Sequence, residues 1–173
     1  FYFYLQVNNN VWDFTYHEHY SYFTVKPLKT YFKNLGLEII DIKPNNTKGG
    51  SMRVALQLIG GNRKISENVE QFIEKEENEG FHTPKIFQSY SKKISYGKEV
   101  YRKFINQIKK DGKKIVGYGA SATSTTLMYH YEMEGDLDYL VDDFEAKQNL
   151  YSPGMGLPVF PPSKLCEDKP DYI

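Results

Sequence analysis

The sequence has a single cysteine and no excess charge, and each shortage excludes a class of protein. With only Cys166 among 173 residues, an internal disulfide framework and a cysteine-ligated zinc site are both excluded. The 22 basic and 22 acidic side chains cancel, which removes the electrostatic basis for binding nucleic acid or an anionic membrane. No apolar run approaches the roughly 20 residues of a membrane span. We therefore expect a soluble, cytoplasmic protein.

The ends of the chain also lack ordinary terminal signals. FYFYLQV, the opening run, has neither the basic start nor the apolar centre of a signal peptide. The chain begins with Phe1 in this strand-like run and stops in the strand-like PDYI. We therefore expect a piece of a longer protein.

The first part of the chain predicts a strand, a helix and a hairpin. FYFYLQV is apolar and β-prone, which favours a buried strand. Thr24 can cap a helix that ends at Gly36. Two further strands separated by a Gly-rich turn predict an antiparallel hairpin over residues 37–59.

Two helices and an alternating α/β pattern follow. A charged helix over 66–80 precedes a longer one that opens at Thr83 and Pro84. The apolar face of this longer helix predicts core packing, and it consists of Phe87, Tyr90, Ile94, Tyr101, Phe104, Ile105 and Ile108. Strand, Gly-rich turn, helix and strand then alternate, which is typical of a βαβ unit with a parallel sheet.

These patterns predict an α/β fold, a Rossmann-like parallel sheet with flanking helices, preceded by a strand/helix/hairpin segment. We expect residues 1–62 to carry the histidine-rich stretch and the hairpin. Residues 63–110 would form a helical connection, and residues 111–173 the Rossmann-like domain.

The stretch VGYGASA places Gly117, Gly119 and Ala122 in a G-x-G-x-x-A arrangement between strand and helix. Glycines there allow a tight turn and let amide groups approach a phosphate at the helix N-terminus. Asp142 ends the next strand, about where a dinucleotide fold places its ribose-binding acid. Taken alone, the pattern indicates NAD, and the alternative is a turn that needs small residues for packing.

Two other stretches stand out. In KGGSMRV the glycines predict a hairpin turn, and Ser51 and Arg53 could also hold a phosphate, since a guanidinium matches it bidentately. TYHEHYSYFT holds two of the four histidines, which leaves a metal site, a proton-transfer site or packing open. A zinc site needs a third ligand, and His82 and His130 lie in unrelated settings, so we expect no metal.

Several motifs in order give a family resemblance. They are TYHEHYSYFT, a Leu-Gly-Leu helix end, GGSMRV, VGYGASA, YLVDDFEAKQ, SPGMGLPVFPP and PDYI. Together they resemble the C-terminal part of the S-adenosylmethionine-dependent sugar C-methyltransferases. Such enzymes combine a cysteine-rich zinc module, a central domain that binds the methyl donor and a C-terminal Rossmann-like substrate domain. The resemblance assigns FYFYLQV to the end of the central domain.

The resemblance implies a reaction and catalytic residues. Family members methylate a carbon next to a ketone on a nucleotide-linked deoxysugar, which requires a base and donors for the enolate. His19 matches the family's base, and its near-neutral titration suits that task. Tyr16 and Glu18 match accompanying polar residues, whereas His17 is expected to be structural. S-adenosylmethionine would be the cofactor, bound mainly by residues outside this chain.

The resemblance also gives the Gly-rich turns a role in binding the nucleotide sugar. The expected substrate-binding residues are Gly50, Ser51, Arg53, Tyr118, Gly119, Ala120, Ser121 and Ala122. The second turn would meet the diphosphate, although Thr123 replaces the Lys or Arg that the family usually carries there. An NAD-dependent Rossmann oxidoreductase and a non-catalytic nucleotide-sugar binding domain are the alternatives. The first of these leaves the histidine stretch and GGSMR unexplained.

Overall fold

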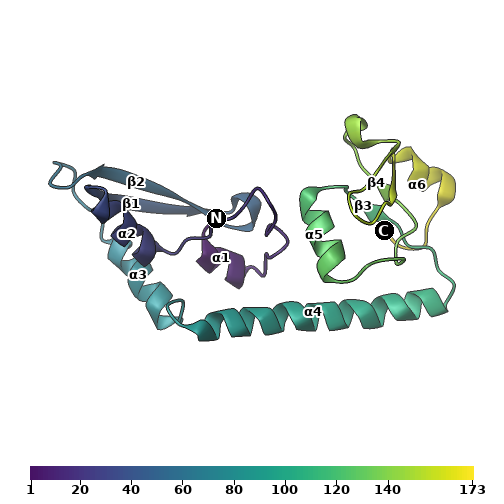
Figure 1. The fold of residues 1–173 in the computed structure, drawn as a ribbon, viewed down its shortest axis with the longest axis horizontal. Coiled ribbons are helices and arrows are strands. Elements are labelled where there is room, and N and C mark those ends of the chain that lie inside the picture. The colour runs from purple at the N-terminus through teal and green to yellow at the C-terminus, as the bar shows by residue number, and fades with distance from the viewer. The chain divides into compact units, whose positions relative to one another are not determined.

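The computed structural model describes residues 1–173, and the chain divides into two compact units. Unit 1 comprises Phe1–Trp12 and His17–Ile94, and unit 2 comprises Asp13–Tyr16 and Ser95–Ile173. Helices and strands occur in both units (Figure 1), which confirms the α/β class. Residues 63–110, predicted as a helical connection, contain helices that are divided between the two units.

The elements have the following bounds. Unit 1 contains α1 (Phe3–Asn8), α2 (Val25–Asn34), β1 (Leu37–Asn45), the 3-10 turn η1 (Thr47–Gly49), β2 (Ser51–Leu58), α3 (Asn68–Asn78) and the first part of α4 (Pro84–Lys110). Unit 2 contains the rest of α4, then β3 (Gly117–Tyr118), α5 (Ala122–His130), β4 (Leu140–Val141), η2 (Glu145–Lys147), β5 (Leu150–Tyr151), β6 (Pro158–Phe160) and α6 (Ser163–Asp168).

The strand predicted for FYFYLQV is wrong, because Phe3–Asn8 form helix α1. Tyr4 and Val7 are buried three positions apart, which places both on one helical face. Only Tyr2 pairs as a strand would, in a single parallel bridge with Phe23. A short apolar run does not reveal its period, so local sequence could not separate strand from helix.

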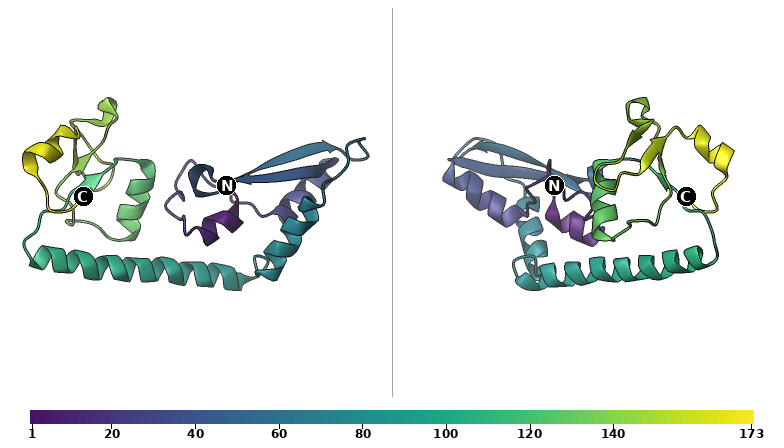
Figure 2. Two further views of the ribbon diagram at one scale, coloured as in Figure 1. Left: turned by 180° about the vertical axis from the view of Figure 1, so that it is seen from behind. Right: turned by 45° about the vertical axis from the view of Figure 1, so that its right-hand side comes forward.

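The predicted antiparallel hairpin is confirmed. β1 pairs with β2 from Leu37 opposite Leu58 to Asn45 opposite Ser51, with an irregularity between Ile39 and Asp41. Helices α2 and α3 lie on the same side of this two-stranded ribbon (Figure 2). The core of unit 1 forms there from side chains of the sheet and helices, including Ile39, Ile42, Val25, Leu28, Val69 and Ile73.

The start of α2 is held differently from the sequence prediction. Thr24 occupies the N-cap position with extended backbone, but its side chain makes no capping bond. Instead the buried Glu76 carboxylate of α3 accepts the Val25 N–H, at 3.0 Å and 2.9 Å from its two oxygens. Burial raises the pKa of Glu76, and its hydrogen bonds oppose that rise.

Unit 2 contains a four-stranded sheet in the order β3-β4-β6-β5. The first three strands are parallel, as predicted, and β5 adds an antiparallel edge that the sequence did not predict. The strand predicted at the end of the chain is reduced to one bridge, between Ile115 and Tyr172.

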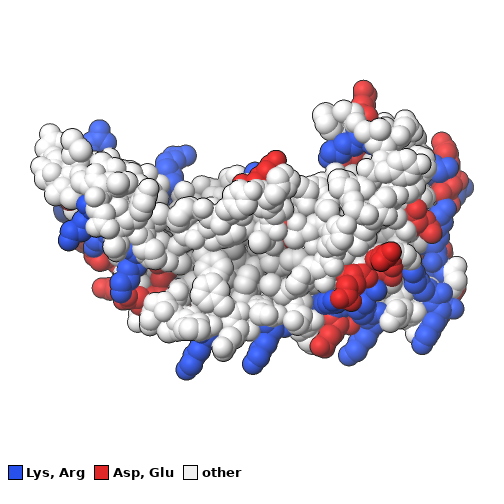
Figure 3. Space-filling view, viewed as in Figure 1, with Lys and Arg blue, Asp and Glu red and all other residues white.

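The long helix α4 does not bury the whole of its predicted apolar face. Ile105 and Ile108 are buried in unit 2, whereas Phe87 and Phe104 are each 56% exposed. Phe87 stacks on Phe3 in unit 1, so different parts of the helix serve different cores. Basic side chains follow the surface of α4 (Figure 3).

A buried carboxylate fixes the second part of α4 in unit 2. Asp136 is only 7% exposed and forms ion pairs with Arg102 and Lys109 of α4. The Tyr101 hydroxyl also donates to it, at 3.2 Å. Such a charge is tolerated in the interior because several donors satisfy it.

Candidate functional site

A pocket of about 370 Å³ in unit 1 contains three of the predicted site residues. His19, Glu18 and Ser51 all line it. The other lining residues are Phe1, Tyr20, Ser21 and Lys48. The structure therefore brings the histidine-rich stretch against the turn before β2, although about thirty positions separate them in the sequence.

His19 lies in this pocket in a setting that favours its neutral form. The side chain is partly buried, and its ring packs edge-on against Phe1 with the centroids 4.4 Å apart. Burial lowers the pKa of His19 and the nearby Lys48 ammonium lowers it further, while Glu18 acts in the opposite direction. A neutral imidazole can accept a proton, which is what a general base requires.

The turn that carries Lys48 is fixed by amide side chains from the start of the chain. Gln6, which is 1% exposed, donates its amide hydrogens to the Lys48 and Gly50 carbonyls, at 3.2 Å and 3.0 Å. Asn9 donates to the Gly49 carbonyl at 2.7 Å. Three carbonyl groups of the turn are thus bonded by side chains from about forty residues earlier.

Gly50 allows the turn to pack closely against α1. A β-carbon at this position would lie 2.4 Å from the β-carbon of Leu5, and the backbone has φ of 148°. Its carbonyl also accepts the Tyr2 N–H at 3.3 Å. The glycine pair in KGGSMRV therefore lets the turn lie directly against α1.

Four other residues that the sequence singled out are absent from the lining of the pocket, namely Tyr16, His17, Gly50 and Arg53. Gly50 lies against α1, and Arg53 is exposed on β2 opposite Lys43. Tyr16 falls in the short segment assigned to unit 2. His17 is exposed, with Nε2 3.9 Å from a carboxylate oxygen of Glu18.

An apolar groove of about 680 Å³ shares Phe1 and Ser51 with the His19 pocket. Its remaining lining comes from α2, β2 and the residue Phe23, and comprises Phe23, Pro27, Leu28, Tyr31, Phe32, Met52 and Val54. The polar pocket and the apolar groove are therefore neighbours within unit 1.

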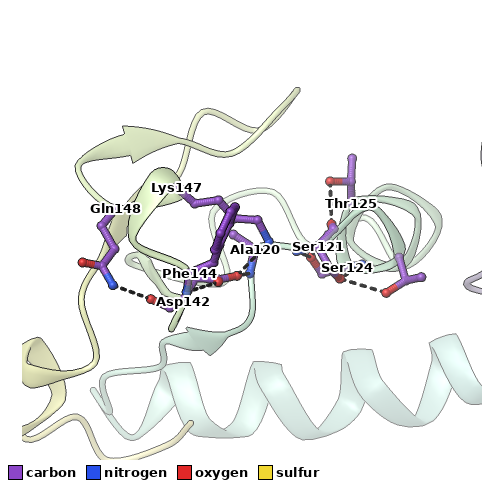
Figure 4. A network of polar contacts seen from close by, with 9 residues as sticks. Ala120, Ser121, Ser124, Thr125, Asp142, Phe144, Lys147 and Gln148 are labelled. Atoms are coloured by element: carbon purple, nitrogen blue, oxygen red, sulfur yellow. Dashed lines mark hydrogen bonds and ion pairs between the residues drawn. The ribbon is translucent and has the colours of Figure 1, made fainter.

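In unit 2 the Gly-rich turn is built around Asp142 (Figure 4). This buried carboxylate accepts the Ala120 N–H at 2.7 Å and the Phe144 N–H at 2.9 Å, and pairs with Lys147 at 3.2 Å. Burial acts to raise the pKa of Asp142, but these donors outweigh it and hold the pKa below its usual range. Both carboxylate oxygens thus already accept hydrogen bonds from donors inside the unit.

Hydrogen bonds within the turn restrict which amides could meet a phosphate. Gly119 donates its N–H to the Val141 carbonyl at 2.7 Å, and Ser121 donates to the Ser124 hydroxyl at 2.8 Å. Ser121 and Ser124 form a capping box at the start of α5. Ala122 and Thr123 open the helix, where backbone N–H groups have no intrahelical acceptor. Ala122 is thus the predicted residue whose amide suits an anion best.

The histidine and acidic side chains do not converge on a metal site. No group of three or more His, Cys, Asp or Glu side chains is placed to hold a metal ion. None of the helices combines the length and the hydrophobicity needed to cross a bilayer.

The sequence interpretation missed Lys48 and Glu76, and it gave Asp142 a different role. Lys48 lines the His19 pocket, Asp142 stabilises the Gly-rich turn from within, and Glu76 caps α2. Lys48 had a weak sequence signal in its position next to the glycine pair. The other two act on partners that are distant in the sequence.

Comparison with known proteins identifies the family. The C-methyltransferase NovU of Streptomyces niveus is 25% identical over 167 residues, which cover 96% of this chain and 40% of NovU. The chain thus spans about two fifths of the length of that curated relative. The family model for the C-methyltransferase C-terminal domain matches residues 46–173. Because this match covers most of the chain, the protein belongs to the family of C-methyltransferase C-terminal domains.

Proposed function

We propose that the chain is the substrate-binding and catalytic-base portion of an S-adenosylmethionine-dependent C-methyltransferase. The substrate would be a nucleotide-linked deoxysugar, methylated at a carbon next to its ketone. The observation that carries this proposal is the pocket that joins His19, Glu18 and Ser51. Membership of a C-methyltransferase family supports the reaction class.

The proposed reaction begins with proton transfer to His19. The imidazole takes the proton from the carbon next to the ketone, and the C–H electron pair forms the double bond of an enolate. The enolate carbon then attacks the methyl group of the donor, and the carbon–sulfur bond of the donor breaks. A general base must be unprotonated before the first step, and the lowered pKa of His19 favours the neutral imidazole that can accept the proton.

Other predicted residues would position the two substrates. In this proposal Glu18 and Ser51 hydrogen-bond the sugar or orient the imidazole, and the Ala122 amide stays a predicted contact of the diphosphate. Tyr16 and Arg53 stay predicted substrate contacts. S-adenosylmethionine would be bound mainly by residues outside this chain.

The NAD-dependent alternative has less support. The family to which the chain belongs is one of methyltransferases, and both oxygens of Asp142 are engaged by donors of unit 2. A dinucleotide site would need such an acid for the ribose.

Replacing His19 in the full-length protein tests the proposal. Solvent deuterium exchange is measured at the carbon next to the ketone of dTDP-4-keto-6-deoxyglucose, with S-adenosylhomocysteine in place of the donor. His19→Asn should lower exchange and kcat by about 10²–10⁴-fold, the usual contribution of a positioned base. Binding of dTDP should change little, because the proton moves in the transition state.

His17→Asn is the matched control, since His17 is the exposed neighbour and does not line the pocket. It should retain most of the activity. Normal turnover by His19→Asn together with a loss in Tyr16→Phe would transfer the role of base to the tyrosine. Absence of both exchange and methylation in the unaltered protein would favour the binding-only alternative.

A further inference from the structure

Lys48 is the one lysine or arginine among the residues that line the His19 pocket. It is exposed and takes part in none of the ion pairs of the chain, although Glu18 lines the same pocket. Three other lysines around the hairpin and its helices, Lys26, Lys29 and Lys43, have carboxylate partners, with Lys43 3.8 Å from Asp41. The ammonium of Lys48 therefore remains available to a ligand in the pocket.

The backbone at Lys48 is held in a conformation that its side chain does not favour. Its φ of 51° and ψ of 42° lie in the left-handed region, which L-residues other than Asn and Asp seldom adopt. Gln6 accounts for this, because it binds the Lys48 carbonyl from α1. An outlier imposed by surrounding structure at the edge of a pocket is a frequent mark of a functional position.

The chemistry proposed for His19 lacks one component. When the imidazole removes the proton, negative charge develops on the ketone oxygen, and an aligned donor in a partly buried site stabilises it. Glu18 cannot do this, because a carboxylate has no hydrogen to donate. Tyr20, Ser21 and Ser51 offer only neutral hydroxyls, and that of Ser51 already donates to the Thr47 carbonyl at 3.0 Å.

We propose that the Lys48 ammonium donates a hydrogen bond to the enolate oxygen formed when His19 deprotonates the substrate. The C–H bond breaks, its proton goes to the imidazole, its electron pair forms the carbon–carbon double bond, and the carbonyl π pair moves to the oxygen beside Lys48. The ligand class is a ketone with an acidic neighbouring C–H. This inference rests on the proposed methyltransferase function and adds a residue to its site.

The test uses Lys48→Met in the full-length protein, with Lys43→Met as the matched control on the same hairpin. Deuterium exchange is followed with saturating dTDP-4-keto-6-deoxyglucose and S-adenosylhomocysteine. Lys48→Met should lower the exchange rate by about 10²–10³-fold, the usual effect of removing one such donor. Lys43→Met should change it less than about twofold, and the dissociation constant for dTDP should be unchanged in both.

Two further measurements separate this role from a structural one. Because a nearby cation disfavours imidazolium, removing Lys48 should move the acidic limb of the pH–rate profile to higher pH. Lys48→Arg keeps the charge and should retain more exchange than Lys48→Met. Lys48→Asn, which tolerates the left-handed backbone, provides a neutral variant if Lys48→Met does not fold.

The outcomes are distinguishable. Equal exchange rates in the unaltered protein and the neutral variants overturn the role of Lys48 alone. If Lys48→Met lowers only the affinity for dTDP, the role of Lys48 at the enolate oxygen is also overturned. Lys48 would then bind a phosphate of the ligand. If the unaltered protein catalyses neither exchange nor methylation, the proposed function fails and this inference fails with it.

Discussion

The two Gly-rich turns of this protein are held together by groups of opposite polarity. In unit 1 the turn before β2 is bonded through its carbonyl oxygens, which accept from Gln6 and Asn9. In unit 2 the turn after β3 is bonded through backbone N–H groups, including that of Ala120, which donates to Asp142. The first turn presents a cation to its pocket, and the second encloses an anion.

This difference shows that a glycine pattern predicts the path of a turn but not the charge of its ligand. The sequence favoured VGYGASA as the phosphate-binding turn, because glycines bring amides close to a helix N-terminus. In the structure the Ala120 amide of this turn donates to the internal carboxylate of Asp142, which also accepts the Phe144 amide. In KGGSMRV the side chain next to the glycines, Lys48, lines the pocket instead.

The largest expected effect is on the stability of unit 2. Asp142→Ala leaves two backbone N–H groups and Lys147 without their acceptor. Removing one partner of a buried charge network costs about 3–5 kcal/mol, so we expect a loss of about 3 kcal/mol in the free energy of unfolding by urea. Asp143→Ala, which removes an exposed neighbour bonded to the Tyr118 hydroxyl, should cost much less.

The effect of Asp142→Ala should depend on pH in one direction. The pKa of Asp142 is lower in the folded chain than in the unfolded chain. Its stabilising contribution is therefore complete above the unfolded value of about 4 and is lost as the pH falls through the folded value. The stability difference between the unaltered chain and Asp142→Ala should shrink below about pH 4, and a constant difference would contradict this account.

Replacing one glycine in each turn separates the stability cost of a steric clash from the cost of backbone strain. Gly50→Ala places a β-carbon 2.4 Å from that of Leu5, so overpacking should cost about 1–3 kcal/mol in addition to strain at φ of 148°. Gly119→Ala meets no atom within 4 Å and should cost only the strain at φ of 102°, about 1 kcal/mol. Thermal unfolding of both variants tests this order, and equal losses would remove the distinction between the turns.

A substitution in the second turn tests whether it still binds a phosphate. Gly119→Val adds bulk on the open side of the turn and should weaken dTDP binding by about tenfold, the loss of roughly one charge-assisted hydrogen bond. Gly112→Val is the matched control, because Gly112 has a positive φ of 66° and open space around it but lies before the strand. Fluorescence titration with dTDP and NADH measures both affinities. Tight NADH binding without dTDP binding would restore the oxidoreductase interpretation.

The smallest effect is expected at the cap of α2. In Glu76→Gln an amide oxygen can still accept the Val25 N–H, while the cost of burying a charge disappears. We expect the stability at neutral pH to stay within about 1 kcal/mol of the unaltered value or to rise. A large loss would show that the charge itself is required.

The pH dependence at Glu76 has the opposite sign to that at Asp142. Burial raises the folded pKa of Glu76 above its unfolded value of about 4.3, so the folded chain binds the proton more tightly. The unaltered chain should therefore gain stability relative to Glu76→Gln as the pH falls from neutral to about 4. Glu77→Gln is the contrasting control, because Lys26 lowers the pKa of the half-buried Glu77.

Local sequence alone determined much of the architecture. Alternating faces and a Gly-rich turn gave the β1–β2 hairpin, and the βαβ rhythm gave the parallel strands β3, β4 and β6. Both signals depend on periodicity and turn chemistry within about twenty residues, which a single sequence displays directly. The ordered motifs also identified the family, and TYHEHYSYFT supplied His19 as a candidate base.

Only the tertiary structure decided how the candidate site is assembled. The helical form of α1 depends on its packing, and Gln6 then fixes Lys48, which lies 42 positions away. Glu76 caps α2 from 51 positions away, where local chemistry had favoured Thr24. Asp142 stabilises a turn that its spacing had assigned to a cofactor. Each of these pairings satisfies a buried polar group, and the partner of such a group is chosen by its position in space rather than in the chain.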